Sequence, residues 1–388
     1  MAKKQIAVMD IGSSKIRVLV FSLSSKKMVE VSGYGEASYA GFSNGEFFES
    51  EKLKDVVETA LSRAQTNAKY IIKELYVGIP ADFIIVKNKQ LSTTFALKKK
   101  IKEVDVSDII DKGNDLKFSK ELTLVASNPI SFRLDNNKYV TDAVGHKSQN
   151  LSAVVSYEYA DNEFIRQFNM IFEQLGLLSV DYASSPLAEF MSMLDENSRK
   201  DYAMIVDCGY ITTHVMIGKN KGIIHLNSFA VGGAHIMADL AEVIKISYDE
   251  AEKLKRKAIL NLDELIVKGG YEVTIKDNPY EVPANMVEDI IKARIDMICD
   301  GILKSLEFSG IEYPKYFPVF LTGGGVSLIK GAKEYISKIL DRPIEILSTK
   351  MPEFSKPYHV QLLSLAEFAL EKEFTISNSF LAKLMKKW

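Results

Sequence analysis

The chain has 388 residues, 47% of them hydrophobic and 26% charged, and a formal net charge of −2. This length favours two or more lobes with separate cores. The charge argues against nucleic acid as a partner, because proteins that neutralise phosphate backbones are usually clearly basic. Cys208 and Cys299 are too few for a disulfide framework and suit a reducing compartment. No signal-peptide core and no membrane-spanning apolar run is predicted.

The first informative stretch is residues 6–22, IAVMDIGSSKIRVLVFS, which predicts a tight β-hairpin. Its turn consists of Gly12, Ser13 and Ser14, which expose backbone N–H groups without bulky side chains. Asp10 precedes the turn and Lys15 follows it. This set suits a phosphate chain: donors and one cation for the oxygens, and the Asp10 carboxylate for a hydrated Mg²⁺. An ordinary Gly-Ser hairpin is the alternative.

The next part of the chain predicts the rest of a first lobe and an insertion. A helix is expected from Ser50 to about Tyr70, followed by strand Leu75–Ile79. Residues 81–160 change to paired strands, beginning with separate strands at Phe83–Lys87 and Gln90–Phe95, with one short helix. We interpret this segment as a small α+β module inserted into the lobe. Its Lys98–Lys100 run fits a solvated edge. A helix at Ser184–Met193 then precedes the second half of the chain.

The second half repeats the opening pattern. Strand Ala203–Val206, a turn at Asp207, Cys208 and Gly209, and the return strand Thr212–Ile217 form a second hairpin with an acid before a glycine. This is an internal repeat of the first hairpin. After the second hairpin we expect a charged helix at Tyr248–Leu260 and a long helix from about Ala284 to Phe308.

A third glycine turn lies in FLTGGGVSLIKG, Phe320–Gly331, where a strand is followed by Gly323, Gly324 and Gly325 and then by a helix expected at Leu328–Leu340. A dinucleotide fingerprint would need a glycine at Leu328, and no Walker A sequence is present. The glycines would let the backbone lie close to a base and sugar. A tight strand-to-helix turn is the alternative.

The three turns in this order resemble the actin/Hsp70 ATPase superfamily and, within it, the FtsA family of bacterial cell-division actin homologues. MDIGSSKI and IVDCGYITTHVMI resemble the two phosphate motifs, and FLTGGGVSLIKG resembles the adenosine motif. Three further segments are similar to FtsA: GYGEASYAGFSNGEFFESEKL, TDAVGHKSQNL, and Ala230–Lys257 with its EAEKLK helix. The likeness covers essentially the whole chain. The pilus assembly protein PilM shares the position of the inserted module and is the nearest alternative.

The resemblance implies an α/β fold with two lobes, an actin-like (RNase H-like duplicated) ATPase fold, and an inserted α+β subdomain in the first lobe. The expected division is 1–80 with 161–195 for the first lobe core, 81–160 for the inserted subdomain, 196–245 with 309–372 for the second lobe core, 246–308 for its small subdomain, and 373–388 for a linker and terminal helix.

The resemblance also implies ATP or ADP with Mg²⁺ in the cleft between the lobes. The residues that match the family's nucleotide motifs, with Asp10 also facing the hydrated metal, are Asp10, Gly12, Ser13, Ser14, Lys15, Asp207, Gly209, Thr212, Gly233, Glu252, Lys255, Arg256, Gly323, Gly324 and Gly325.

The second hairpin departs from the family pattern. Tyr210 and Ile211 stand where small residues are usual, and His214 stands where relatives have an acid. A strand histidine with ordinary partners is the simpler interpretation of His214. Ser185 stands where some relatives have Glu, and serine is a poor general base at neutral pH. We therefore expect a slow ATPase at best, and no catalytic residue is assigned.

The C-terminal end, SFLAKLMKKW, predicts a membrane-surface helix after a short polar linker, Thr375–Ser379. Apolar residues fall on one helical stripe and lysines flank it, which suits an anionic bilayer. A last helix docked on the body is the alternative. The residues concerned are Phe380, Leu381, Lys383, Leu384, Met385, Lys386, Lys387 and Trp388.

The resemblance implies several partners and a location. They are the C-terminal peptide of the tubulin-like division protein FtsZ, docked on the second lobe's small subdomain, further copies of the chain in a filament that uses the inserted module, other divisome proteins and anionic inner-membrane lipids. The expected place is the cytoplasmic face of the cell membrane at the division site. A PilM-like scaffold of a pilus or secretion complex is one alternative. A sugar-kinase-like enzyme is another, but no catalytic acid facing a polar substrate pocket is found.

Overall fold

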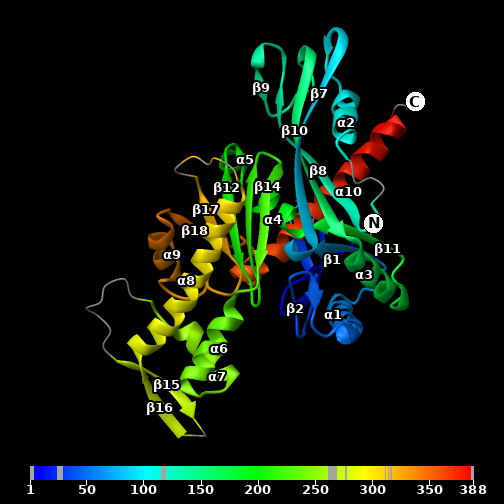
Figure 1. Ribbon diagram of the computed structural model, residues 1–388. Helices are drawn as coiled ribbons and strands as arrows, with labels where there is room; N and C mark the ends of the chain where they lie inside the picture. The colour runs from blue at the N-terminus through cyan, green and yellow to red at the C-terminus, as the bar shows by residue number, and fades with distance from the viewer. Residues whose placement is uncertain are drawn as a thin grey trace.

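The computed structural model describes residues 4–23, 29–114, 119–260, 269–275, 278–310, 312, 314 and 317–385, with side chains described through Glu373 apart from Leu23 and Asn136. Two lobes, each built on a five-stranded sheet, lie side by side, and a third sheet rises from the first lobe (Figure 1).

The first lobe contains the predicted hairpin at the centre of its sheet, whose strand order is β11-β6-β1-β2-β3. The strands are β1 (Ile6–Ile11), β2 (Lys15–Leu23), β3 (Val29–Ser38), β6 (Glu74–Ile79) and β11 (Ser179–Ser184). β1 is antiparallel to β2 and parallel to β6. Every residue of β1 is buried, because helices cover both faces of the sheet.

Two helices cover one face of this sheet, α1 (Leu53–Ala68) and α3 (Asn162–Gln174), through side chains such as Val57 and Phe168. On the other face lies α10 (Val360–Met385), whose Leu365 packs with Val8 and Leu19. A small hairpin, β4 (Phe42–Ser43) and β5 (Glu46–Phe47), precedes α1.

The second lobe repeats this arrangement with the order β14-β13-β12-β17-β18. Its strands are β12 (Ala203–Cys208), β13 (Thr213–Lys219), β14 (Gly222–Phe229), β17 (Val319–Thr322) and β18 (Ile344–Ile346). Again the first strand is antiparallel to the second and parallel to a later one. The internal repeat predicted from the two hairpins is thus a repeat of whole sheets.

The helices α6 (Gly233–Ile244), α8 (Ala284–Phe308) and α9 (Ala332–Leu340) form one core with the second sheet. Helix α4 (Ser185–Met193) packs its Phe190 on the opposite face. Since α4 also packs along α10, these two helices lie between the sheets of the two lobes. A short helix, α5 (Glu196–Arg199), connects α4 to the second lobe.

The inserted subdomain has the sheet order β7-β10-β8-β9, with α2 (Glu103–Asp111) packed on one face. The strands are β7 (Ile84–Lys100), β8 (Leu122–Arg133), β9 (Tyr139–Val140) and β10 (Lys147–Asp161). The prediction of separate strands at 83–87 and 90–95 was wrong. Asn88 and Lys89 continue the pairing with β10, so one long strand runs through the expected break.

The small part of the second lobe contains α7 (Tyr248–Lys257) and a hairpin, β15 (Gly270–Ile275) with β16 (Asn278–Pro283). The long helix was predicted with its correct ends, Ala284 and Phe308. Helix α9 starts at Ala332 rather than at Leu328, because Gly331 adopts a left-handed backbone with φ of 82°.

The C-terminal helix also differs from expectation. α10 continues without interruption to Met385, so residues 375–379 are helical and do not form the expected linker (Figure 1). The side chains from 374 onward and residues 386–388 lie outside the described set. No helix within the described part of the chain is long and apolar enough to cross a membrane.

Candidate functional site

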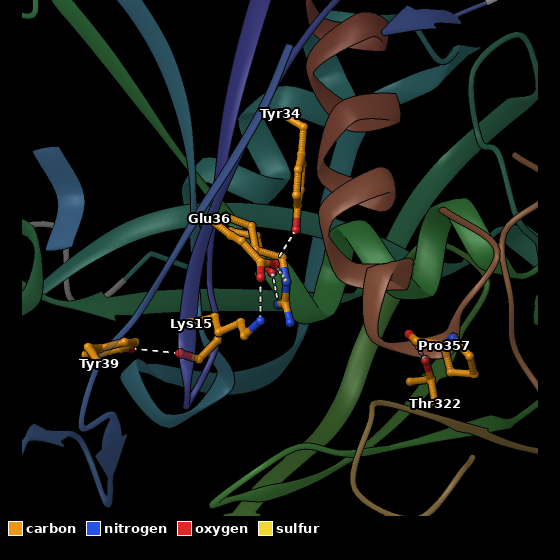
Figure 2. Close-up of polar contacts among 9 residues, drawn as sticks. Lys15, Tyr34, Glu36, Tyr39, Thr322 and Pro357 are labelled. Atoms are coloured by element: carbon orange, nitrogen blue, oxygen red, sulfur yellow. Dashed lines mark hydrogen bonds and ion pairs between the residues drawn. The ribbon is translucent and has the colours of Figure 1, made fainter. Parts of the chain in front are cut away.

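A cleft of about 630 Å³ separates the two lobes and is lined by both hairpins, by α7, by the turn after β17 and by residues 357–361. The hydroxyl of Thr322 donates to the carbonyl of Pro357 at 3.0 Å and joins two of these walls (Figure 2). Most of the predicted binding residues line the cleft: Gly12, Ser13, Ser14, Lys15, Asp207, Gly209, Thr212, Glu252, Lys255, Arg256, Gly323 and Gly324. Asp10, Gly233 and Gly325 are not among its lining residues.

The predicted phosphate lysine already has a partner. Lys15 forms an ion pair with Glu36 of β3, which also accepts a hydrogen bond from the Tyr34 hydroxyl at 2.6 Å (Figure 2). Partial burial works against ionisation of Glu36, but the hydrogen bonds from Lys15 and Tyr34 lower its pKa overall. The positive charge of Lys15 is therefore largely neutralised by the Glu36 carboxylate on the neighbouring strand β3.

A second cation on the same strand, Arg17, was not predicted to bind. It lines the cleft, and its guanidinium donates to Asp10 at 3.2 Å. Burial raises the pKa of Asp10 to about 6, although Arg17 acts in the opposite direction. Asp10 Oδ1 has no hydrogen-bond partner among the described residues. The strand register could have revealed Arg17, because it lies directly opposite Asp10 in the hairpin.

The tips of the two hairpins contact each other. The backbone N–H of Ile211 donates to the Ser13 hydroxyl at 3.1 Å, so this amide faces the first hairpin. The N–H of Gly209 donates to the carbonyl of Thr212 at 2.9 Å within its own turn. Two of the second hairpin's backbone donors are consequently satisfied inside the protein.

His214 is the residue at which the sequence departs most clearly from the family. Its Nε2 lies 2.6 Å from Asp82 Oδ2, and the Thr212 hydroxyl lies 3.1 Å from the same nitrogen. Burial lowers the pKa of His214, but the nearby Asp82 carboxylate more than compensates and the pKa is raised. The histidine therefore has a specific acidic partner, as the simpler interpretation from the sequence requires.

The glycines of the adenosine motif differ in role. Gly323 has φ of 81°, and a Cβ there would lie 2.3 Å from Asp207 Oδ1. A Cβ on Gly233 would lie 2.6 Å from Gly325 Cα, and one on Gly325 would lie 2.4 Å from the Gly209 carbonyl oxygen. These glycines allow backbone segments to meet at the end of β12. Gly324 differs, since its nearest neighbour would be Tyr358 Cβ at 3.3 Å.

Helix α7 brings a charged group to the cleft. Lys255 is almost completely buried and lies 2.6 Å from Glu252 Oε2, while its Nζ also donates to the carbonyl of Gly233 at 3.2 Å. Arg256 donates to Glu252 Oε1 at 2.7 Å. The i,i+3 and i,i+4 spacing of these residues on one helix places them together.

A buried acid, Glu189 of α4, was missed. Its side chain is fully buried, and neither carboxylate oxygen has a hydrogen-bond partner among the described residues. Burial raises its pKa well above the usual range, and the charges of Asp207 and Asp10 add to the effect. Sequence reasoning considered Ser185, one turn earlier, which is buried and does not line the cleft.

The sequence of this chain is similar to those of FtsA cell division proteins. The family model described as "Cell division protein FtsA" matches residues 204–364. The FtsA protein of Neisseria meningitidis serogroup B is 24% identical over 88% of this chain and 83% of its own length. FtsA of Streptococcus pneumoniae serotype 2 is 23% identical over 93% of this chain and 79% of its own length.

Solved structures show the same fold at low identity. The PilM–PilN type IV pilus biogenesis complex matches with a TM-score of 0.64 and 14% identity, over 95% of this chain and 99% of that one. MreB5 of Spiroplasma citri bound to AMPPNP matches with a TM-score of 0.57 and 12% identity, over 98% and 100%. The predicted fold class is confirmed. This chain is similar to FtsA cell division proteins, and it has the actin-like, two-lobed α/β fold of the solved structures that it matches.

Proposed function

We propose that the chain is an ATP-binding, actin-like protein of cell division that assembles at the membrane. The observation that carries the proposal is the cleft of about 630 Å³ lined by both glycine hairpins and by the turn after β17. Its volume is typical of small-molecule sites, and its polar groups come from several elements that converge between two lobes. The relationship to FtsA proteins supports the division role.

The phosphate chain would lie at the first hairpin. Gly12, Ser13 and Ser14 supply its tip, and the partly buried Arg17 supplies a cation that keeps its charge at any physiological pH. Asp10 Oδ1, which has no hydrogen-bond partner within the described part of the chain, fits a hydrated Mg²⁺. When bound, Mg²⁺ would offset the negative charge of the phosphates.

The adenosine would lie at the opposite wall. Glu252 and Arg256 of α7 line the cleft there, as do Gly324 and Tyr358. Gly324 is the glycine of its motif with the most room beside it, so its backbone can approach a base.

Hydrolysis would be slow. The Ile211 amide is occupied by Ser13, which leaves the second hairpin with fewer donors for a transition state. Ser185 is buried and does not line the cleft. Burial and the negative charges of Asp207 and Asp10 raise the pKa of Glu189 and favour its protonated form. A protonated acid cannot act as a general base.

At the membrane, the end of α10 would attach to anionic lipid on the cytoplasmic face, and the body would recruit FtsZ through its C-terminal peptide. Self-assembly into filaments would strengthen attachment, because many weak anchors act together. Contacts with other proteins of the division machinery and a role in septum formation follow from the same proposal.

A PilM-like scaffold is the second candidate. The match to the PilM–PilN complex over almost the whole of both chains favours it, although at 14% identity this likeness concerns the fold. A peptide that binds the inserted subdomain, together with no binding of the chain to lipid, would support this candidate.

The test is a titration with a fluorescent ATP analogue and Mg²⁺. We expect micromolar binding by the wild-type chain and by Gly324→Ala, and a loss of at least about tenfold in Gly324→Asp, because the new side chain would occupy the space proposed for the base and bring an unpaired charge there. Equal binding by all three chains, or none by the wild type, would contradict nucleotide binding in this cleft.

A further inference from the structure

The inserted subdomain is joined to the second lobe as well as to the first. Asp82 belongs to η2 (Ala81–Phe83), which ends directly before β7, the first strand of the subdomain. Its Oδ2 lies 2.6 Å from Nε2 of His214 in β13. Because Asp82 lies at the start of the inserted segment 81–160 and His214 belongs to the second lobe, this ion pair joins the two beside the cleft.

The other end of β13 also meets the subdomain. Ser156 of β10 donates to the carbonyl of Ile223 at 2.6 Å, and Asn88 of β7 donates to the carbonyl of Ile224 at 2.5 Å. In return, Asn220 donates to the carbonyl of Ile130 in β8 at 2.7 Å. The turn after β13 and the first residues of β14 thus lie against the base of the subdomain, with hydrogen bonds to three of its strands.

The ion pair differs from these hydrogen bonds because it is charged and lies at the cleft. The His214 side chain is 8% exposed and that of Asp82 is 2% exposed, so solvent screens the pair weakly. Asp207 of β12 is a second acid that acts on His214. His214 also lines the cleft, so the pair connects the wall of the cleft with the start of β7.

We propose that the Asp82–His214 pair is a lock that holds the inserted subdomain in one orientation relative to the second lobe. His214 is then a positioning residue: it acts on the subdomain through Asp82 and η2. Without the pair, the hydrogen bonds at the β13–β14 turn remain, but the subdomain can pivot about them, since its entry strand is no longer fixed at the cleft. The proposal does not depend on nucleotide binding.

The test measures the distance between two spin labels in the full chain without nucleotide. Labels go on Tyr139→Cys in the subdomain and Val243→Cys in α6, both exposed positions. The native Cys208 and Cys299 are fully buried, and burial raises the pKa of each thiol to about 12, so they resist labelling. We expect one narrow distance distribution in the labelled parent.

Asp82→Asn and His214→Gln should each broaden or shift this distribution, and the double variant should change it no further, because both remove the same contact. The exchange of the two residues, Asp82→His with His214→Asp, should restore the narrow distribution. The matched control is Asp201→Asn, which removes a mostly exposed partner of Lys219 at 3.6 Å on the same strand and should have no effect.

An unchanged distribution in folded Asp82→Asn and His214→Gln would overturn the lock, with folding checked by circular dichroism. A change of equal size in Asp201→Asn would also overturn it. Failure of the nucleotide titration would contradict the proposed function and leave this result intact, since no step of the distance measurement uses nucleotide.

Discussion

Arg17 and Asp10 lie opposite each other in the first hairpin, and their side chains pair at 3.2 Å beside the cleft. Lys15, two residues before Arg17, is instead paired with Glu36. The Arg17 side chain is 12% exposed and that of Lys15 is 36% exposed. A guanidinium that is already held in place loses less conformational freedom on binding than a more exposed lysine.

We therefore expect Arg17 to contribute more to ATP affinity than Lys15. Arg17→Ala should raise the Kd for a fluorescent ATP analogue at least about tenfold, and Lys15→Ala less than about threefold, because Arg17 is already held in place by Asp10 and Glu36 and the more exposed lysine must be ordered on binding. Thermal unfolding of each variant is the control for the loss of the Asp10 partner. The reverse order of effects would show that Lys15 is the phosphate cation.

Glu158 gives the chain a pH-dependent stability. This acid in β10 is fully buried, and burial raises its pKa to about 7, although the Ser184 hydroxyl acts in the opposite direction. A carboxyl group whose pKa is raised by folding stabilises the protein below its unfolded pKa, and this contribution is lost as the pH rises through about 7.

Glu158→Gln should remove that dependence. By urea unfolding, the variant should exceed the wild type in stability at pH 9 by about 3 kcal/mol, the free energy that corresponds to such a pKa change, and differ little at pH 4. A parallel pH dependence of both chains would mean that Glu158 does not titrate as its burial requires.

Gly323 is required by the backbone. Gly323→Ala should lower the free energy of unfolding by about 3 kcal/mol or more, since it combines a positive φ with a Cβ 2.3 Å from Asp207 Oδ1 and the Cys208 carbonyl oxygen. Gly176→Ala is the matched control, because Gly176 also has positive φ and nothing within 4 Å of its Cβ position. It should cost about 1 kcal/mol, and equal losses would remove the crowding argument.

The last part of α10 is expected to bind membranes without contributing to the stability of the body. Glu373 accepts from Lys4 at 2.7 Å and from the Tyr76 hydroxyl at 3.0 Å, so the helix is anchored on the first lobe up to this residue. Truncation after Glu373 should abolish co-sedimentation with anionic liposomes and leave the Tm unchanged. Retained liposome binding would refute the anchor.

Glu189 is expected to stay protonated and to take no part in hydrolysis, because it is fully buried, does not line the cleft and has its pKa raised by burial. Glu189→Gln, which matches the protonated acid in shape and charge, should therefore change ATP turnover and the Kd for ATP less than about threefold. Ser185→Ala is the control from the same helix and should have an equally small effect. A loss of turnover of about tenfold or more in Glu189→Gln alone would show that Glu189 is ionised when nucleotide is bound.

The sequence by itself determined the repeated acid-glycine hairpins, the long helix from Ala284 to Phe308 and, through the resemblance, the fold class. These features are local or periodic: alternation of apolar residues, glycine at tight turns and helical spacing do not depend on distant parts of the chain. Most of the predicted binding residues line the cleft for the same reason, since they belong to the turns themselves.

Only the tertiary structure decided which partners these residues have. The pairing of Lys15 with Glu36 needs the register of β2 and β3, and the pairing of His214 with Asp82 joins positions 132 residues apart. The burial of Glu189 depends on a helix held between two sheets. Such contacts arise from the packing of elements that are distant in sequence. Burial and neighbouring charges then set the pKa values of the side chains involved, and the local sequence pattern contains no information on either.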